Sequence, residues 1–375
     1  MRVFVGMSGG VDSSLTAALL KEQGYDVTGV YMKNWTEDLP GMRCPWADDL
    51  ADAKRVAVQL GIPFKVYDFQ AEYKQKVVDY MIDEYKAGRT PNPDIMCNQE
   101  VKFKIFLETA LEDGADLIAT GHYARIGRTA SSSIVSDAPD AIGQSVLSGS
   151  AGKAESSSTE DEAVLCAAKD VKKDQTYFLY RVTGEALKKT LFPLGSYEKT
   201  EVRKMAEERG LLTASKKDSQ GICFVGSVGI KDFLSEFVET SPGNVVDKES
   251  GAVVGRHDGA IFYTIGQRHG LGLGGGLPYY VVGKDMDKNE VYVSRDLNSE
   301  TLWTELIPLT NTHWINQPPA EGEKLKVRLR HQGALLDATY EAGALRLHDA
   351  QRAVSSGQSA VVYQGEVCLG GGIVA

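Results

Sequence analysis

Apolar and polar positions along the first 215 residues follow two alternating patterns. Short runs rich in β-branched and other apolar residues predict buried strands at 2–7, 26–32, 64–69 and 116–121. Segments in which apolar residues recur about every 3.6 positions predict helices at 15–23, 48–60, a stretch ending near Lys86, 98–112 and 198–209. Strands that alternate with helices predict an α/β fold with a doubly wound parallel sheet, which binds ligands at the carboxyl ends of its strands.

The pattern changes further along the chain. Residues 164–183 predict two strands around a polar turn at Lys172–Gln175. From about Ser215 the strands become short and glycine-rich, and helical periodicity is confined to about 229–238. We therefore expect an α/β domain, a small β-rich central domain and a C-terminal β-barrel, with the following boundaries: 1–214, 215–295 and 296–375.

Composition excludes several classes of protein. No run of 18 apolar residues is present, and Asp12 interrupts any signal-peptide core, so we expect a cytoplasmic protein with no membrane partner. The five cysteines have no CxxC spacing, which excludes a secreted disulfide framework and a zinc ribbon. They are Cys44, Cys97, Cys166, Cys223 and Cys368.

The net charge of −10 argues at first against a nucleic-acid partner. Residues 129–165, however, carry six acidic residues and one lysine, a net charge of −5, and are rich in Ser, Gly, Ala and Asp. This composition predicts a flexible insertion at about 129–163. Half of the negative charge is therefore expected to lie outside the folded domains, and the total charge does not exclude a nucleic-acid partner.

A Ser-Gly-Gly-Val-Asp-Ser loop at 8–13 connects the first predicted strand to the first helix. Gly9 and Gly10 let the backbone approach a bound group, and the helix that follows offers free N–H groups to an anion. This loop contains neither the GxxxxGK[ST] motif nor the GxGxxG fingerprint. The loop resembles that of the ATP pyrophosphatases, which hold the β- and γ-phosphates during attack on the α-phosphate. The alternative is a glycine-rich turn without a ligand.

Other segments also carry candidate chemistry. Residues 88–98 place two prolines and a carboxylate ahead of Cys97, just before a predicted helix, where a thiol has a lowered pKa. In 215–224, Cys223 follows a pair of lysines, which also favours a thiolate. Residues 262–271 form a glycine-containing loop with adjacent Arg and His. Taken singly, the two cysteine segments are better explained by a structural role, and the third segment is weak evidence for a phosphate contact.

Taken together, these segments resemble one family, the tRNA-specific 2-thiouridylases. The motifs that carry the resemblance span the chain: GMSGGVDSS, TPNPDIMCN, ATGHYA, KDQTYFL, DSQGICF, FYTIGQRHGLG and SGQSAVVY. The resemblance implies an adenine nucleotide alpha hydrolase-like (PP-loop) domain, a small central domain and a C-terminal β-barrel. It also implies a sulfurtransferase that uses ATP and Mg²⁺ to convert the wobble uridine (U34) of tRNA to 2-thiouridine, with AMP and pyrophosphate as products. The implied partners are the anticodon stem-loop of tRNA and a sulfur-carrier protein or cysteine desulfurase.

The resemblance also implies roles for individual residues. Cys97 matches the nucleophile and Cys223 the cysteine that carries a persulfide, and the two would form a disulfide after sulfur transfer. Asp94 would transfer a proton, and no metal is expected apart from the Mg²⁺ that accompanies ATP. The positions that match the ATP site are Gly6, Met7, Ser8, Gly9, Gly10, Val11, Asp12, Ser13, Met32 and Gly121. The target base would contact Asn92, Pro93 and Asp94, and the tRNA would contact His122, Lys173, Asp174, Gln175, Arg328, Leu329 and Gln358.

This chain departs from the family at Leu329, where the usual residue is Tyr, and in the length of the insertion. Alternative hypotheses are another PP-loop enzyme, such as a small-molecule amide ligase, and an RNA-binding relative without catalysis. The cysteines on separate segments argue against the ligase, and the intact loop argues against the inactive relative. An iron–sulfur cluster on Cys44, Cys97 and Cys223 is a further alternative, which the absence of CxxC spacing disfavours.

Overall fold

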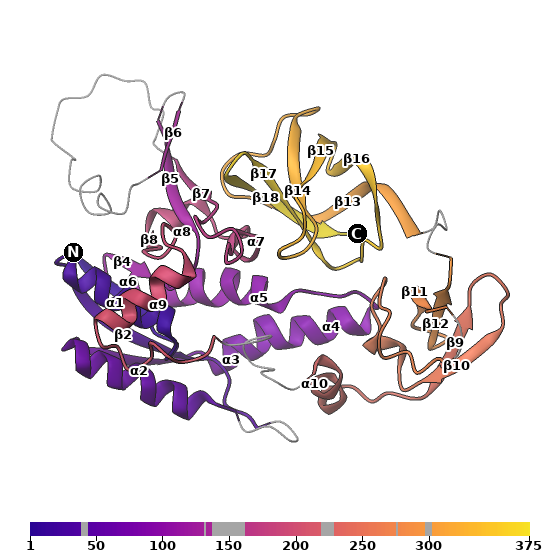
Figure 1. Ribbon diagram of the computed structural model, residues 1–375, viewed down its shortest axis with the longest axis horizontal. Helices are drawn as coiled ribbons and strands as arrows, with labels where there is room; N and C mark the ends of the chain where they lie inside the picture. The colour runs from indigo at the N-terminus through magenta and orange to yellow at the C-terminus, as the bar shows by residue number, and fades with distance from the viewer. Residues whose placement is uncertain (39–43, 131–132, 137–161, 219–228, 275–276, 297–301) are drawn as a thin grey trace.

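The structure is a computed structural model. Figure 1 shows a helix-rich α/β part, a small β-rich part and a β-barrel that lies beside the first part. Cys223 and most of the expected insertion lie outside the residues that the structure describes. The described residues are 1–38, 44–130, 133–136, 162–218, 229–274, 277–296 and 302–375.

A parallel sheet of five described strands forms the α/β part, in the order β3-β2-β1-β4-β8. The strand order reverses at β1, so the loops that follow β1 and β4 face each other at the switch point, where such sheets bind ligands. The doubly wound parallel sheet predicted from the sequence is confirmed. Its strands are β1 (Arg2–Gly6), β2 (Asp26–Lys33), β3 (Phe64–Asp68), β4 (Leu117–Ala119) and β8 (Thr190–Leu191).

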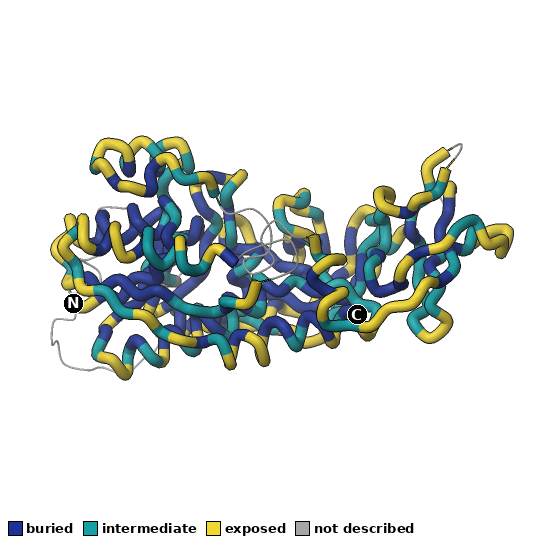
Figure 2. The backbone as a smooth tube through the Cα atoms, turned by 90° about the horizontal axis from the view of Figure 1, so that it is seen from below, coloured by how far each residue is buried: buried dark blue, intermediate teal, exposed yellow. Residues whose placement is uncertain are grey.

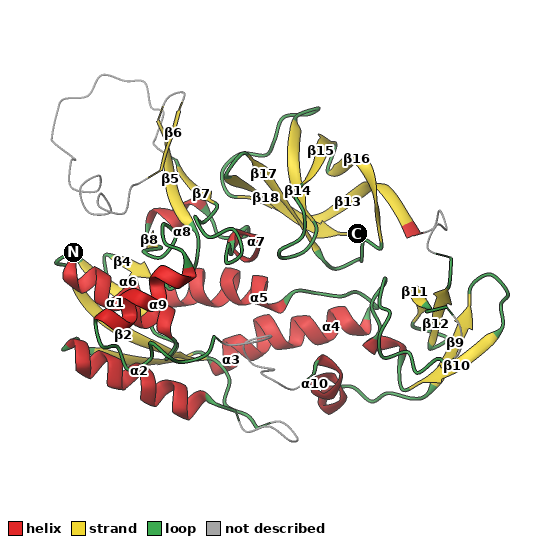
Figure 3. Cartoon of the chain, in the orientation of Figure 1, coloured by secondary structure: helices red, strands yellow, loops and turns green. Residues whose placement is uncertain are grey.

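Helices cover both faces of this sheet (Figure 3). Val3 and Val5 pack with helices α1 (Val11–Glu22) and α2 (Trp46–Leu60), whereas Phe4 between them packs on the opposite face. This alternation follows from the two-residue period of a strand. The helical segments of the opposite face are α3 (Gln70–Tyr73), η1 (Lys74–Asp79), α4 (Tyr80–Lys86), α5 (Pro93–Met96), η2 (Cys97–Ile105) and α6 (Phe106–Glu112), of which η1 and η2 are π-helical.

Residues 164–183 do not form the two predicted strands. The first strand is present as β7 (Ala163–Cys166), but helix α7 (Thr176–Leu179) replaces the second, and helix α8 (Gly184–Lys188) follows it. The Asp174 carboxylate accepts the hydroxyl hydrogen bond of Thr176 at 2.8 Å, which stabilises the turn at the start of α7. The strand prediction was wrong because a short apolar run has no period that separates a buried strand from a buried helix.

The expected insertion begins and ends in regular structure. Strands β5 (Arg125–Ala130) and β6 (Ser133–Ser136) pair as an antiparallel hairpin, and β7 pairs with the other edge of β5. Strand β7 also pairs with β18 (Val367–Val374), so the hairpin continues the sheet of the barrel. Residues 137–161 lie outside the described part of the chain.

After helices α9 (Lys199–Glu208) and α10 (Ile230–Phe237), the described chain is mainly β-structure. The middle part is a sheet of four described strands, with a short helix η3 (Ala260–Phe262), in the order β10 (Val253–His257), β9 (Gly243–Asp247), β12 (Glu290–Ser294) and β11 (Tyr280–Asp285). Six described strands then close a barrel through the pairing of β13 with β18. They are β13 (Trp303–Trp314), β16 (Ala344–Arg352), β15 (Leu336–Glu341), β14 (Lys324–Arg328), β17 (Ser359–Gln364) and β18.

These findings confirm the predicted β-rich middle and C-terminal barrel. Figure 2 shows that buried residues run through the middle of the molecule and that exposed residues lie mainly at its periphery. Of the helices that the structure describes, none has the length and apolar character needed to cross a membrane.

Candidate active site

The loop between β1 and α1 is held closed by its own serines. The Ser8 backbone N–H donates to the Ser13 Oγ at 3.1 Å, and the Ser13 hydroxyl donates to the Gly10 carbonyl at 3.2 Å. Ser14 donates to the same carbonyl at 2.8 Å. Gly10 caps α1 without a side chain, so the first N–H groups of the helix remain available to an anion.

Two glycines explain how closely this loop is packed. Gly9 has a φ of 73°, and a Cβ there would collide with the backbone carbonyl of Asp49. A Cβ on Gly121 would lie 2.8 Å from the backbone nitrogen of Ser13 and 2.9 Å from the carbonyl carbon of Asp12. The end of β4 therefore touches the first turn of α1, and only glycine fits at this contact.

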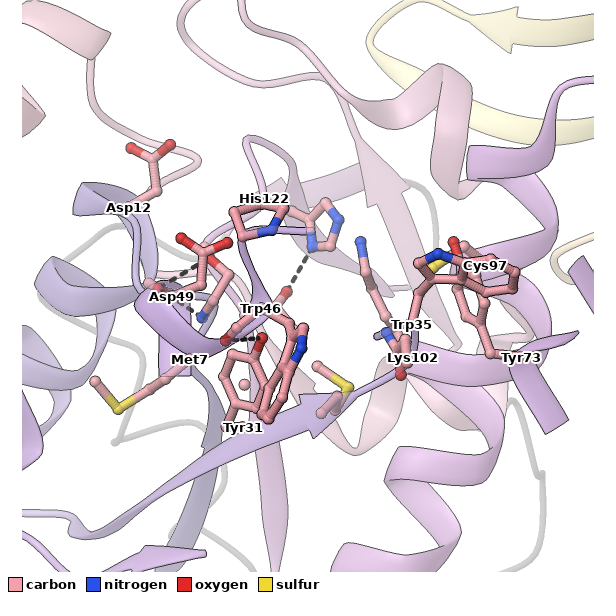
Figure 4. A pocket seen from close by; sticks show the side chains of 18 of the residues that line it. Met7, Asp12, Tyr31, Trp35, Trp46, Asp49, Tyr73, Cys97, Lys102 and His122 are labelled. Atoms are coloured by element: carbon pink, nitrogen blue, oxygen red, sulfur yellow. Dashed lines mark hydrogen bonds between the residues drawn. The ribbon is translucent and has the colours of Figure 1, made fainter. Parts of the chain in front are cut away.

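A cavity of about 300 Å³ opens beside the loop. Its volume lies at the lower end of the range for small-molecule sites. In the view of Figure 4, Asp12 lies at one end of the cavity and Cys97 at the other, with His122 between them. The predicted residues that line the cavity are Gly6, Met7, Ser8, Asp12, Ser13, Met32, Cys97, Gly121, His122 and Gln175.

The remaining predicted loop residues do not line this cavity. Gly9 and Gly10 shape the backbone, and Val11 is buried with the core between α1 and α9. The lining residues that the sequence did not predict for the nucleotide site are Tyr31, Asn34, Trp35, Cys44, Pro45, Trp46, Asp49, Tyr73, Lys102 and Thr120. Tyr31 and Thr120 adjoin predicted residues at the carboxyl ends of strands. Their place at strand ends could have predicted them, because such sheets bind ligands there.

Cys97 is buried, with an exposed fraction of 2%. The helical segment begins at Pro93, so Cys97 lies one turn inside it, and the prediction that Cys97 precedes the helix was wrong. Proline suits the first helical position, and the Asn92 side chain caps the helix by accepting the Asp94 backbone N–H at 3.2 Å. Asn92, Pro93 and Asp94 lead into Cys97 but do not themselves line the cavity.

Cys44 lines the same cavity as Cys97. Its thiol donates to the Trp35 carbonyl at 3.6 Å, and burial raises its pKa. Cys44 is therefore a thiol at neutral pH, in contrast to the thiolate that metal binding requires. Among the residues that the structure describes, no group of three His, Cys, Asp or Glu side chains is arranged to hold a metal ion.

His122 is a neutral imidazole inside this site. Burial, and then the nearby positive charge of Lys102, hold the pKa of His122 well below its ordinary value. Its Nδ1 lies 2.7 Å from the Thr120 hydroxyl, and its ring lies 5.6 Å from that of Phe103 and 6.0 Å from that of Phe192. His122 therefore lies in the cavity wall and is buried, although the sequence predicted a tRNA contact there.

Asp12 is part of an ionic group that sequence reasoning missed. The Lys199 ammonium lies 2.7 and 2.8 Å from the two carboxylate oxygens of Asp12, and the Tyr123 hydroxyl donates to Asp12 at 2.8 Å. Burial and then the negative charge of Asp12 raise the pKa of Tyr123, so its hydroxyl keeps its proton. Lys199 had no signal in the sequence because it lies 187 positions from Asp12.

Several predicted tRNA contacts lie at the boundary between the α/β part and the barrel. Asp174 and Arg328 form an ion pair at 3.1 Å, with side chains only 4% and 10% exposed. Gln358 donates to the Thr90 carbonyl at 2.8 Å, and Leu329 packs against the core of the barrel. The structure thus shows Asp174, Arg328 and Gln358 joining two parts of the protein. Contact of these residues and of Leu329 with tRNA stays a prediction.

Two other predicted tRNA contacts lie near the cavity. The Gln175 side-chain oxygen accepts the Tyr123 backbone N–H at 2.8 Å, which places Gln175 in the cavity wall. Lys173 forms an ion pair with Asp218 at 2.7 Å, and its side chain is 39% exposed. Lys173 is thus more exposed than Asp174 and Arg328, whose side chains are 4% and 10% exposed.

Comparison with known proteins identifies the family. Residues 1–227 match the family model described as "tRNA methyl transferase HUP domain", 231–295 match "tRNA methyl transferase PRC-barrel domain", and 304–374 match "Aminomethyltransferase beta-barrel domain". A Bacillus subtilis protein named "tRNA-specific 2-thiouridylase MnmA" is 46% identical over 381 residues, which cover 100% of this chain and 94% of the relative. The chain belongs to the tRNA-specific 2-thiouridylase family.

Further relatives agree with this assignment. A Listeria monocytogenes member of the family is 44% identical over 384 residues, with the same coverage of both chains. Among solved structures, NMN synthetase from Francisella tularensis is similar over 58% of this chain and 66% of that chain, at 12% identity and a TM-score of 0.33. That score is too low to support an argument, and the family rests on the sequence relatives. The resemblance stated from the motifs is confirmed.

Proposed function

We propose that this protein transfers sulfur to C2 of the wobble uridine (U34) of tRNA in an ATP-dependent reaction. The observation that carries the proposal is that the phosphate loop and Cys97 line one cavity. The loop suits the phosphates of ATP, which would activate the uridine. The Cys97 thiol in the same cavity suits the sulfur transfer that would follow. An amide ligase would need the loop but not the thiol.

The chemistry begins with activation of the base. The O2 atom of uracil attacks the α-phosphate of ATP, and pyrophosphate leaves. The terminal sulfur of a persulfide on Cys223 then attacks C2, and AMP leaves with O2. Cys97 attacks the Cys223 sulfur, which releases 2-thiouridine and leaves a Cys97–Cys223 disulfide for a thiol reductant to reduce. The uridine must leave the anticodon stack before these atoms can meet.

Residues of the cavity divide between these steps. The N–H groups at the start of α1 would hold phosphate oxygens, with Met32 and Gly121 beside the adenosine. Asp12 and Asp49 are the carboxylates that line the described part of the cavity. In this structure each is paired with a lysine, Asp12 with Lys199 and Asp49 with Lys216, so each would exchange that partner to hold the Mg²⁺ that accompanies the phosphates. The ion would neutralise charge on the leaving pyrophosphate.

The segment before Cys97 would receive the flipped base. Asn92, Pro93 and Asp94 would contact the uracil, and Asp94 would move a proton during the exchange of oxygen for sulfur. The proposed tRNA contacts are those named from the resemblance: His122, Lys173, Asp174, Gln175, Arg328, Leu329 and Gln358. The proposed location is the cytoplasm, where a sulfur-carrier protein or cysteine desulfurase would load Cys223.

The test is nucleoside mass spectrometry on tRNA from cells that lack this protein. We expect the 2-thiouridine derivatives to disappear and to return when the gene is restored. Unchanged 2-thiouridine would refute the proposal. Hydrolysis of ATP to AMP that does not depend on tRNA would instead favour a small-molecule ligase, and the absence of any ATP turnover would favour an inactive RNA-binding relative.

A further inference from the structure

Residues 213–218, here called the docking segment, are joined by ion pairs to α2 and α9. They precede position 219, where the described chain is interrupted. One of its attachments is Lys216, whose ammonium lies 2.8 Å from Asp49 and 2.7 Å from Asp52 on α2. Asp49 lines the cavity, and its backbone carbonyl is the group that excludes a Cβ from Gly9. Lys216 therefore joins the docking segment to the residue that packs against the loop.

The second attachment is Asp218. Its carboxylate accepts from Lys199 at 2.9 Å, from Arg203 at 2.7 Å and from Lys173 at 2.7 Å. Lys199 is the residue that also binds Asp12. One ammonium group, with its side chain only 12% exposed, thus bridges a carboxylate of the phosphate loop and a carboxylate of the docking segment.

Arg203 reinforces this attachment through the backbone. One of its guanidinium nitrogens donates to the Ala214 carbonyl at 2.9 Å and to the Lys216 carbonyl at 3.0 Å, while the other binds Asp218. Because Lys199 and Arg203 both belong to α9, a single helix holds the backbone and the carboxylate of the docking segment. The segment is fixed in position and not merely attracted by charge.

The charges are balanced so that Asp218 stays ionised. Burial opposes the charged form of Asp218, but hydrogen bonds from Lys173 and Lys199 outweigh it and lower the pKa to about 2. Lys216 forms ion pairs with both Asp49 and Asp52. Both attachments are therefore charge-assisted at neutral pH, which strengthens each hydrogen bond.

The position of Asp218 in the chain limits how far Cys223 can lie from the docking segment. Cys223 follows Asp218 by five positions, and five residues span at most about 18 Å when fully extended. We propose that Lys199 and Asp218 are positioning residues that tie the chain bearing the persulfide cysteine to the loop that holds ATP. This inference rests on the proposed function, because it assigns the two residues to the coupling of its two half-reactions.

The proposal predicts that Asp218→Asn affects the two half-reactions differently. Asp218→Asn removes the carboxylate of the docking segment but leaves Lys199 bound to Asp12, so the phosphate loop keeps its partner. Adenylation is therefore retained while sulfur transfer slows. A loss of tRNA affinity does not account for such a result, because removal of a negative charge favours phosphate binding.

The experiment measures both half-reactions on the full chain. Adenylation is followed as tRNA-dependent exchange of labelled pyrophosphate into ATP, and sulfur transfer as 2-thiouridine formed from a persulfide donor. For Asp218→Asn we expect exchange within about twofold of wild type and a thiolation rate lowered about tenfold, the size expected when charged hydrogen bonds are lost. Asp218→Glu should recover much of the thiolation, and hydrogen exchange at 213–218 should be faster in Asp218→Asn than in wild type.

Glu22→Gln is the matched control. Glu22 and Arg209 form an ion pair at 2.7 Å that also joins α1 to the end of α9, near the other end of α1 from the phosphate loop. Glu22→Gln also removes one carboxylate that joins α1 to α9, but at the end of α1 away from the phosphate loop. Both half-reactions should therefore stay at the wild-type rate. If Asp218→Asn does not fold, Lys216→Met removes the other attachment and should give the same separation.

Two results would overturn the inference. Equal losses of exchange and thiolation in Asp218→Asn would show general damage to the site, and wild-type rates for both would show that the attachment has no role. A wild-type protein that forms no 2-thiouridine would instead refute the proposed function itself. The wild-type measurement therefore separates the two failures.

Discussion

The side-chain amide of Gln358 donates a hydrogen bond to the backbone carbonyl of Thr90 at 2.8 Å. The Thr90 N–H in turn donates to the Ser356 carbonyl at 3.0 Å, and its hydroxyl lies 3.2 Å from that of Thr264 in the middle part. Thr90 begins the short segment that runs into the helix of Cys97. The barrel and the middle part therefore hold the segment that presents Cys97 to the cavity.

Gln358→Ala tests this relationship. The variant removes the donor to Thr90, so we expect thiolation to fall severalfold while the affinity for ATP, measured by calorimetry, stays near the wild-type value. A lost neutral hydrogen bond costs about 1 kcal/mol, which leaves the fold intact. Gln364→Ala is the control, since Gln364 binds Glu323 at the barrel surface. Equal effects of the two variants would contradict a positioning role for Gln358.

Asp12→Ala and Ser13→Ala test the phosphate loop. Ser13→Ala removes the acceptor of the Ser8 N–H, and Asp12→Ala leaves Lys199 without its loop partner. We expect each to lower conversion of ATP to AMP by a factor of about 10² or more, with tRNA binding in gel-shift assays nearly unchanged. Ser235→Ala removes a helix hydroxyl far from the loop and should have no effect. Wild-type adenylation by either loop variant would show that the loop does not hold ATP.

Gly121→Ala tests the contact between β4 and α1. The added Cβ would lie 2.8 Å from the Ser13 nitrogen, and both partners are backbone, so neither can rotate away. We expect ATP affinity to fall about tenfold or more and the melting temperature to drop, as overpacking costs about 1–3 kcal/mol. Gly274→Ala is the control, because no atom lies within 4 Å of its added Cβ. A Gly121→Ala protein with normal ATP affinity would show that this contact does not shape the nucleotide site.

The cysteines should have unequal roles. Cys223→Ser should block thiolation with adenylation intact, because it removes the sulfur carrier. Cys97→Ser should also fail to release 2-thiouridine but should accumulate a persulfide on Cys223, which mass spectrometry of the intact protein would detect. Two purely structural thiols would instead lower stability without a selective loss of sulfur transfer.

Controls for the cysteines come from the same chain. Cys166→Ser and Cys368→Ser should retain sulfur transfer, since both thiols are buried in the sheet that joins the hairpin to the barrel. Cys44→Ser should also retain it. If Cys44→Ser is as damaging as Cys97→Ser, a cluster held by three cysteines becomes the better explanation.

His122 makes stability depend on pH. Its pKa is lowered by burial, so below about pH 6.5 the unfolded chain binds a proton that the folded protein does not. The stabilisation is complete above that pH and is lost as the pH falls toward the lowered pKa, by up to about 1.4 kcal/mol per pH unit. His122→Gln should flatten the dependence of the urea midpoint between pH 7 and pH 5. His348→Gln, at an exposed residue, is the matched substitution with which the His122 variant is compared.

Patterns of neighbouring residues were sufficient to predict much of the α/β part. Strand β1, helix α1 and the loop between them depend on apolar period, glycine and serine within about 20 positions. The helix of Cys97 was placed too late because the capping residue and the proline at its start were interpreted as a rigid loop. The strand predicted near residue 178 is helix α7 in the structure, for a related reason: a short apolar run does not indicate whether it packs as a strand or as a helix.

Motifs in the sequence by themselves determined the family and predicted the nucleotide loop and the candidate cysteines, since each of these depends on residue types at short spacing. Only the tertiary structure brought Asp12 to Lys199, Asp174 to Arg328 and Gln358 to Thr90. These partners lie 154 to 268 positions apart. Pairs at such separations form when the sheet, helix α9 and the barrel pack together. A local sequence pattern therefore does not predict which side chains will become partners.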